Sequence, residues 1–229
     1  MLIQHFYGIL TFMKKAKNDN KTIILDVAQQ LFYENGINNT SYETIAKECG
    51  ITKPMISYYF DSKAHLAGTI FGKYSREMSD YFTEKVYQSV SGYAVLDINA
   101  AFSIMQAHYY KTEQKAFRFY IEFFDSSFVD VTEGVEDFYK MTARQLGLKI
   151  SYQRLHMLYI GSNYAARGLI YHYANGDIQC SQDEFEQYYM RNSYYMYGLN
   201  DQQIGQLLTN AKEILSKVPF EFLPNFKLK

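Results

Sequence analysis

Side chains that could contact nucleic acid gather in one segment of the sequence, TSYETIAKECGITKPMISYYFDSKAHL, which covers residues 40–66. Lysine can reach the base-edge acceptors of guanine, and methionine or tyrosine can contact the methyl group of thymine. The residues expected on the exposed face of a recognition helix are Lys53, Pro54, Met55, Ser57 and Tyr58. All of them except Pro54, whose variation would affect base preference, are candidates for reading base edges in a major groove.

The same segment supplies groups suited to phosphate oxygens. Thr52 would offer a hydroxyl at a helix N-terminus, Tyr59 a phenolic hydroxyl and Lys63 a point charge. Thr40 or Ser41 could contact phosphate from the start of the preceding helix. Tyr59 is equally compatible with a place in the core.

Two short helices joined by a tight turn would position these side chains. Ser41 can cap a helix through Cys49, and Thr52 can cap a second from Lys53 to about Phe60, because a proline is tolerated in the first helical turn. Gly50 would supply the turn between them. The apolar anchors of the pair are Ile45, Cys49, Ile51, Ile56 and Tyr59, with the small Ala46 at the crossing. This spacing predicts a helix-turn-helix.

The rest of the chain has helical periodicity and no convincing strand pair, which predicts an all-α fold. A first helix over 21–34 should end at Gly36, and a long helix from near Ser62 should carry apolar residues every fourth position to Val86. Further helices are expected at about 96–111, 113–126, 130–147, 152–174, 182–197 and 201–217. We therefore predict an N-terminal three-helix helix-turn-helix domain that a long helix joins to a C-terminal helical bundle.

The segment resembles the TetR/AcrR family of regulators. Members of that family show Thr-x-x-x-Ile-Ala, Gly-Val-Ser, Tyr-x-Tyr-Phe and Ser-Lys-x-x-Leu patterns after a helix that ends in glycine. The matching positions are Gly36, Ile45, Ala46, Gly50, Ile51, Thr52, Tyr59, Phe60, Ser62, Lys63 and Leu66. Ser57 replaces the usual tyrosine and Ala64 a common acidic residue, so phosphate contacts and the start of the long helix are expected to differ in detail.

The resemblance covers roughly residues 20–68 and implies three regions. Residues 1–19 would be a disordered extension, 20–66 the DNA-binding domain, and 67–229 an effector-binding and dimerisation domain. Lys14, Lys15 and Lys17 could form an arm along the DNA, although a solvated tail is the simpler interpretation. Residues 1–12 could also precede the natural start of the protein, because Met13 is followed by two lysines.

The effector domain is rich in aromatic residues, with fifteen of the 23 tyrosines at or after Tyr93. Such a bundle could enclose an apolar or aromatic small molecule, although an aromatic side chain at helical spacing is more often simply part of the core. Polar residues on largely apolar helices are the candidates for effector contacts: His108, Arg118, Tyr120, Glu122, His156, Tyr159, Asn163 and Arg167.

A homodimer is expected from two helices of this domain. The helix over 152–174 has a stripe of small residues, and the helix over 201–217 has an apolar face. The stripe is Gly161, Ala165 and Gly168, and the face is Ile204, Leu207, Leu208, Ala211 and Leu215. Two helices from each subunit could form a four-helix interface, whereas in a monomer these faces would be buried internally.

The resemblance also implies a mechanism for release of the DNA. Binding of an effector would shift the long helix and change the separation of the two recognition helices, so that a repressor leaves a palindromic operator.

Composition excludes several other classes of protein. The formal net charge of −1 argues against a protein that binds nucleic acid by overall charge. Cys49 and Cys180 are isolated, which argues against disulfides and structural zinc and fits the cytoplasm. The apolar start of the chain has neither the pattern of a signal peptide nor the length of a membrane span.

The sequence also lacks the common enzymatic fingerprints, and its histidines are not at metal-ligand spacings, so no enzyme, metal or cofactor is expected. The alternative that stays open is a DNA-binding architectural or division-control protein of the same fold without a small-molecule effector.

Overall fold

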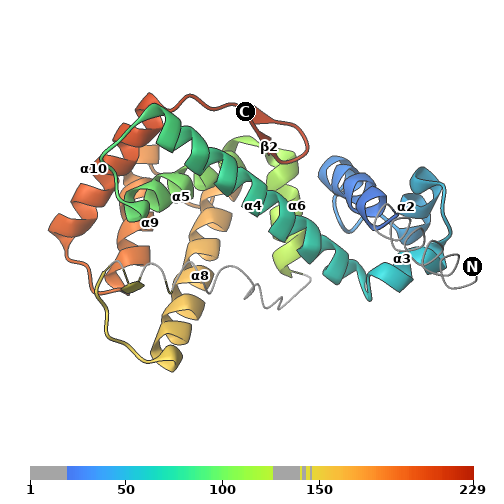
Figure 1. The fold of residues 1–229 in the computed structure, drawn as a ribbon, viewed down its shortest axis with the longest axis horizontal. Helices are drawn as coiled ribbons and strands as arrows, with labels where there is room; N and C mark the ends of the chain where they lie inside the picture. Colours follow the sequence, from blue (N-terminus) through green and yellow to red (C-terminus); the bar gives the residue numbers. More distant parts are fainter. Residues whose placement is uncertain (1–19, 126–139, 141–142, 145) are drawn as a thin grey trace, which may run out of the picture. The chain divides into compact units, whose positions relative to one another are not determined.

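A computed structural model of the chain describes residues 20–125, 140, 143–144 and 146–229 (Figure 1). The described part is helical apart from loops and one short strand pair, which confirms the predicted all-α class. Its helices are residues 20–35, α2 (Tyr42–Cys49), α3 (Lys53–Tyr59), α4 (Lys63–Ser89), α5 (Val95–Thr112), α6 (Gln114–Asp125), α8 (Tyr152–Asn175), α9 (Gln182–Tyr195) and α10 (Asp201–Lys217). The expected extension over 1–19 and most of the helix expected over 130–147 lie outside the described residues.

The chain divides into two compact units. The first contains described residues 20–73 and 122–125, and the second contains 74–121 together with the described residues after 139. The expected boundary after residue 66 therefore falls within α4, and a short stretch from α6 returns to the first unit. Both α4 and α6 are continuous helices whose residues are shared between the units.

The first unit follows its local sequence signals. The helix over 20–35 buries Ile24, Ala28 and Phe32, which are four residues apart and so lie on one face. Ser41 caps α2, because its Oγ accepts a hydrogen bond from the N–H of Thr44 at 3.0 Å. Gly50 ends α2 at a φ of 66°, a left-handed conformation that glycine adopts without a Cβ clash, and the chain turns there into α3.

Helix α4 has the apolar face predicted for it. The side chains repeat every four residues and are each no more than 2% exposed: Leu66, Ile70, Tyr74, Met78, Phe82 and Val86. Burial of aliphatic and aromatic side chains of this size stabilises a fold by roughly 1.5–3 kcal/mol each.

The second unit is built on α5, which packs against both α8 and α10, while α9 packs against α8 and α10. The apolar face predicted for a dimer interface on α10 is only partly covered within the chain. Ile204, Leu207 and Ala211 are buried, whereas Leu208 and Leu215 are half-buried. On α8, a Cβ built at Gly161 would lie 2.5 Å from the Cε of Met196, so this small residue admits a neighbour from the same chain.

A C-terminal strand pair, which the sequence analysis did not predict, completes the second unit. Strands β1 (Phe222–Leu223) and β2 (Lys227–Leu228) pair antiparallel. Between them, Asn225 and Phe226 both have positive φ, at 63° and 60°. The ring of Phe226 is 3% exposed and stacks on Tyr74, with 4.4 Å between ring centroids. Burial of this ring offsets a backbone conformation that is unfavourable for a bulky residue.

No helix within the described residues is long and apolar enough to cross a membrane.

Candidate DNA-binding site

The exposed face of α3 is the centre of the candidate site. Ile56 is fully buried and fixes which side of this two-turn helix faces inward. Lys53, Pro54, Ser57 and Tyr58 are exposed, and their spacing places them together on the opposite side. Tyr58 is 67% exposed, which is unusual for so large an apolar ring. The structure thus brings four of the five expected recognition-helix residues onto one accessible surface.

The start of α3 leaves a hydroxyl free for a partner. Thr52 stands at the N-cap position with extended backbone, but its side chain makes no capping hydrogen bond within the described structure. The expectation that Thr52 caps α3 is therefore met by its position and not by its side chain. Its exposed hydroxyl is available to an outside acceptor such as a phosphate oxygen.

Lys53 is paired with an acidic side chain of the neighbouring helix. Its ammonium group forms an ion pair with the carboxylate of Glu43 on α2, and both side chains are exposed. The hydrogen bond from Lys53 is the main cause that lowers the pKa of Glu43. The pair joins the two helices of the motif across solvent, where such pairs are weak, so a DNA phosphate or base edge could compete for the lysine.

Met55 and Tyr59 are half-buried, in contrast to the other candidates on α3. The Sδ atom of Met55 accepts a contact of 3.7 Å from the Nδ2 of Asn20, which ties α3 to the helix over 20–35. The ring of Tyr59 meets that of Tyr58 edge-on, with 5.2 Å between centroids. Both residues support the helix as well as border its exposed face.

Thr40 has a structural role and is a correction to the expected set. Its side chain is 1% exposed, and its hydroxyl donates to the carbonyl of Gly36 at 2.7 Å, so it cannot reach a phosphate. Lys63 also points back into the unit, where its Nζ donates to the carbonyls of Ile37 at 2.8 Å and Thr40 at 3.3 Å. Ser41 is exposed as expected.

Sequence reasoning did not single out Tyr42 at the start of α2. Its hydroxyl oxygen is buried and has no hydrogen-bond partner within the described structure. Burial, with a smaller effect of Asp61, raises the pKa of this hydroxyl. No local sequence signal distinguishes such a tyrosine, because the burial depends on how α2 packs.

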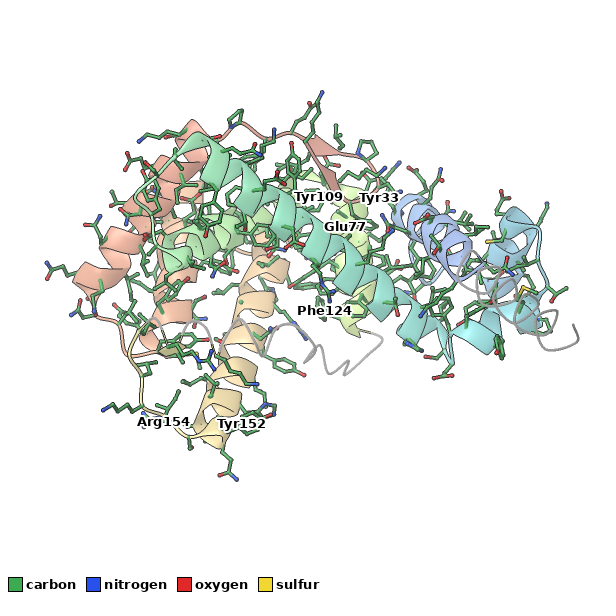
Figure 2. All side chains as sticks on the ribbon, viewed as in Figure 1. Tyr33, Glu77, Tyr109, Phe124, Tyr152 and Arg154 are labelled. Carbon is green, nitrogen blue, oxygen red and sulfur yellow. The ribbon has the colours of Figure 1, made fainter. Side chains whose placement is uncertain are left out.

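The residues proposed for effector binding have different local surroundings. Glu122 belongs to the first unit, where its Oε2 accepts the N–H of Asn38 at 2.9 Å, so it is not an effector contact in the helical unit. His108 lies beside Phe222, with 6.1 Å between rings. His156 stacks on Tyr152, also with 6.1 Å between rings, and Figure 2 labels Tyr152 at the start of α8. Arg118 and Asn163 are half-buried, and the side chain of Tyr159 lies outside the described structure.

Among the residues proposed for effector binding, Tyr120 and Arg167 interact electrostatically. Tyr120 is buried, its ring lies 4.3 Å from that of Tyr110, and burial raises its pKa well above the ordinary range. The positive charge of Arg167 partly opposes this rise in the pKa. The hydroxyls of Tyr110 and Tyr74 are 3.0 Å apart, which extends the group to α4.

Comparison with known proteins identifies the first unit. Residues 24–70 match the family model of bacterial regulatory proteins of the tetR family. The N-terminal part of the chain thus carries a TetR-family region. The resemblance predicted from the sequence is thereby confirmed, and the matched residues include most of the helix over 20–35 together with α2 and α3. Because the family consists of regulatory proteins, the assignment also supports the expectation that the chain is not an enzyme.

One curated relative is similar to the chain over a short stretch. The chain is 36% identical over 58 residues to the HTH-type transcriptional regulator AcrR of Shigella flexneri, and this match covers 25% of the chain and 27% of that protein. The match thus spans about a quarter of the curated relative.

Two solved structures match a larger part of the chain at lower sequence identity. A tetR-family transcriptional regulator from Streptomyces coelicolor is 15% identical, with a TM-score of 0.52 over 88% of this chain and 90% of that one, which supports the fold. A TetR-like transcriptional regulator from Rhodococcus sp. RHA1 is 18% identical, with a TM-score of 0.45 over 79% of this chain and 97% of that one.

Proposed function

We propose that this TetR-family chain is a transcriptional repressor that binds a palindromic operator as a homodimer in the cytoplasm and is released by a small-molecule effector. The observation that carries the proposal is the exposed face of α3, where a lysine, a serine and a tyrosine lie beside one another. A helix of this kind fits the major groove, where its side chains can read base edges.

The contacts with bases would come from Lys53, Ser57 and Tyr58. Lysine can donate to guanine, serine can pair with several base edges, and the tyrosine ring can contact a thymine methyl group. Pro54 would shape the approach of α3 to the groove, and Met55 would contribute at the border of the face.

Contacts with the phosphate backbone would flank this face. Thr52 and Ser41 offer exposed hydroxyls at the starts of α3 and α2. Tyr59 is half-exposed beside Tyr58. Lys63 would contribute less than a free lysine, because its ammonium group already donates to two carbonyls. Such contacts fix the register of the protein on the duplex without specifying its sequence.

Exposed apolar side chains on α8 support a dimer through this helix, which is one of the two predicted for the interface. Met157, Ile160, Tyr164 and Tyr171 are all exposed, and their spacing places them along one side of the helix. Exposed Tyr188 and Tyr195 add to this surface from α9, which packs on α8. A second copy of the chain would cover these side chains and could hold two recognition helices roughly 34 Å apart, one turn of DNA.

The effector would be an apolar or aromatic small molecule bound in the second unit, near the group formed by Tyr74, Tyr110 and Tyr120 with Arg167. Aromatic walls with few oriented polar groups are typical of such sites. The effector must prefer the arrangement of the dimer that does not fit DNA, since a ligand that binds both arrangements equally shifts nothing.

Close packing of the rings around Tyr74 favours the second candidate function. The rings of Tyr74, Phe119 and Phe226 pack within 4.4–5.9 Å of one another, as they would in a core without a ligand. An architectural or division-control protein of this fold would bind many DNA sites, and apolar and aromatic compounds would not release it from any of them.

The proposal is tested by footprinting the DNA immediately upstream of the gene with the purified full chain. We expect a protected palindrome that is lost in Lys53→Ala and in Tyr58→Ala. Tyr87→Ala is the matched control, because Tyr87 is a comparably exposed tyrosine on α4 in the second unit. Protection that survives both substitutions in α3 would refute the assignment of the recognition face.

A further inference from the structure

A five-residue turn, residues 36–40, joins the helix over 20–35 to the capping residue of α2. The turn is closed from within by a hydrogen bond from the N–H of Thr40 to the carbonyl of Ile37 at 3.3 Å and by the hydroxyl of Thr40 on Gly36. Asn39 adds a side-chain bond of 3.1 Å to the carbonyl of Asn35. Because Ser41 follows directly, the position of this turn sets where α2 begins.

Charged side chains from two other helices hold the same turn. From α4, the ammonium group of Lys63 donates to the carbonyls of Ile37 and Thr40 at 2.8 and 3.3 Å. From α6, the carboxylate of Glu122 accepts the N–H of Asn38 at 2.9 Å. Each charge meets backbone groups of the complementary polarity. Hydrogen bonds to an ionised group are shorter and roughly twice as strong as those between neutral groups.

Aromatic packing fixes the end of α6 at this place. Phe123 stacks on Phe71 of α4, with 4.8 Å between ring centroids. Phe124, which Figure 2 labels near the end of α6, meets Phe71 edge-on at 5.2 Å. Phe123 is fully buried. The neighbouring Glu122 is therefore presented to the turn by a packed element.

We propose that Glu122 is a positioning residue for DNA binding, which together with Lys63 clamps the turn over residues 36–40 and so fixes the first turn of α2. This inference rests on the proposed function for its link to DNA. Loss of the carboxylate leaves the N–H of Asn38 without its acceptor, and the turn and the start of α2 become mobile. The exposed hydroxyl of Ser41 then no longer stands where a phosphate would meet it.

The clamp is tested by hydrogen exchange with mass spectrometry on the full chain, comparing wild type with Glu122→Ala and Glu122→Gln. We expect amide exchange over residues 36–45 to rise about tenfold in Glu122→Ala, in keeping with a hydrogen bond to a charged group. Glu122→Gln should show a smaller rise, because its amide oxygen still accepts a hydrogen bond. Glu77→Ala is the control, since Glu77 is an exposed glutamate of α4 in the second unit.

Exchange over 36–45 that is unchanged in Glu122→Ala would overturn the clamp. A rise of equal size throughout the chain would overturn it as well, because it would report a general loss of stability. The hydrogen-exchange experiment does not require the protein to bind DNA. A failure of the wild type to protect any DNA would instead refute the proposed function, while the exchange data would still decide whether the clamp exists.

The link to DNA is tested by the affinity of the same variants for the protected operator. We expect the dissociation constant to rise about tenfold in Glu122→Ala, to rise less in Glu122→Gln and to stay unchanged in Glu77→Ala. An unchanged affinity in Glu122→Ala, despite faster exchange over 36–45, would overturn the positioning role.

Discussion

The two units use similar side chains in opposite ways. On α3, the side chain of Tyr58 is mostly exposed. In the second unit, Tyr74 and Tyr110 are buried, their hydroxyls are 3.0 Å apart, and burial raises the pKa of each well above the ordinary range. Both of these tyrosines stay neutral in the folded protein. A tyrosine thus belongs to a binding surface in the first unit and to the stabilising core in the second, and exposure, not residue type, separates the two roles.

The largest effect should come from the core of the second unit. Phe226→Ala removes a buried ring that contacts Tyr74 and Phe119, and we expect a loss of about 3–5 kcal/mol in the free energy of unfolding. Urea denaturation of the full chain measures it. Tyr87→Ala, at an exposed position, should change this free energy by less than about 0.5 kcal/mol. A loss below about 1 kcal/mol for Phe226→Ala would show that the strand pair does not belong to the core.

An intermediate effect should come from the helix caps, which occur in both units. Ser41 of α2 and Ser181 of α9 each accept a backbone N–H, at 3.0 and 3.2 Å. Ser41→Ala and Ser181→Ala should each lower the free energy of unfolding by about 1 kcal/mol. Only Ser41→Ala should also weaken operator binding, which a gel-shift titration measures. Equal affinities for the two variants would remove Ser41 from the phosphate contacts.

The smallest effect should come from the ion pair on the recognition surface. Glu43→Gln releases Lys53 for DNA, so the slope of the logarithm of operator affinity against the logarithm of salt concentration should steepen by up to about one unit. Asp183→Asn, which breaks a comparable exposed pair with Lys212 in the second unit, is the matched control and should leave the slope unchanged. A steeper slope in both variants would point to an effect of net charge alone.

The stability that the Glu43–Lys53 ion pair contributes depends on pH, and the lowered pKa of Glu43 gives the direction of this dependence. The pKa of Glu43 is lowered in the folded protein, mainly by the hydrogen bond from Lys53. Its stabilising contribution is therefore present above the ordinary pKa of glutamate and is lost as the pH falls through the lowered value. A titration of Glu43 by NMR should show this lowered pKa in the wild type and a return toward the ordinary value in Lys53→Ala. An unchanged pKa in Lys53→Ala would mean that the pair does not form in solution.

The first unit was predictable because its signals are local. Ser41 and Gly50 each act within four residues of their own position, and they set the ends of α2 where the sequence indicated. Thr40, next to Ser41, was predicted to contact phosphate, but its hydroxyl instead donates to the carbonyl of Gly36. The direction of one side-chain rotation is not encoded in residue type.

The remaining errors involve partners that are distant in the sequence. Glu122 was assigned to an effector site, but its hydrogen-bond partner Asn38 lies 84 residues away. The apolar face of α10 was assigned to a second subunit, but three of its five residues are buried within the chain. Periodicity shows that a helix has an apolar face, and it does not show what covers that face. The C-terminal strand pair was missed because its turn, with Asn225 and Phe226 at positive φ, contains no glycine.

That strand pair has a consequence for synthesis of the protein. The ring of Phe226 covers Tyr74, which the ribosome adds about 150 residues earlier. Translation proceeds at roughly 5–20 residues per second, so Phe226 is added on the order of ten seconds after Tyr74. During that interval the aromatic face of α4 is without its final cover, and a chain cut short before Phe226 would keep it so. Phe226 therefore decides whether the helical unit has a complete core or is left with an apolar surface that chaperones and proteases recognise.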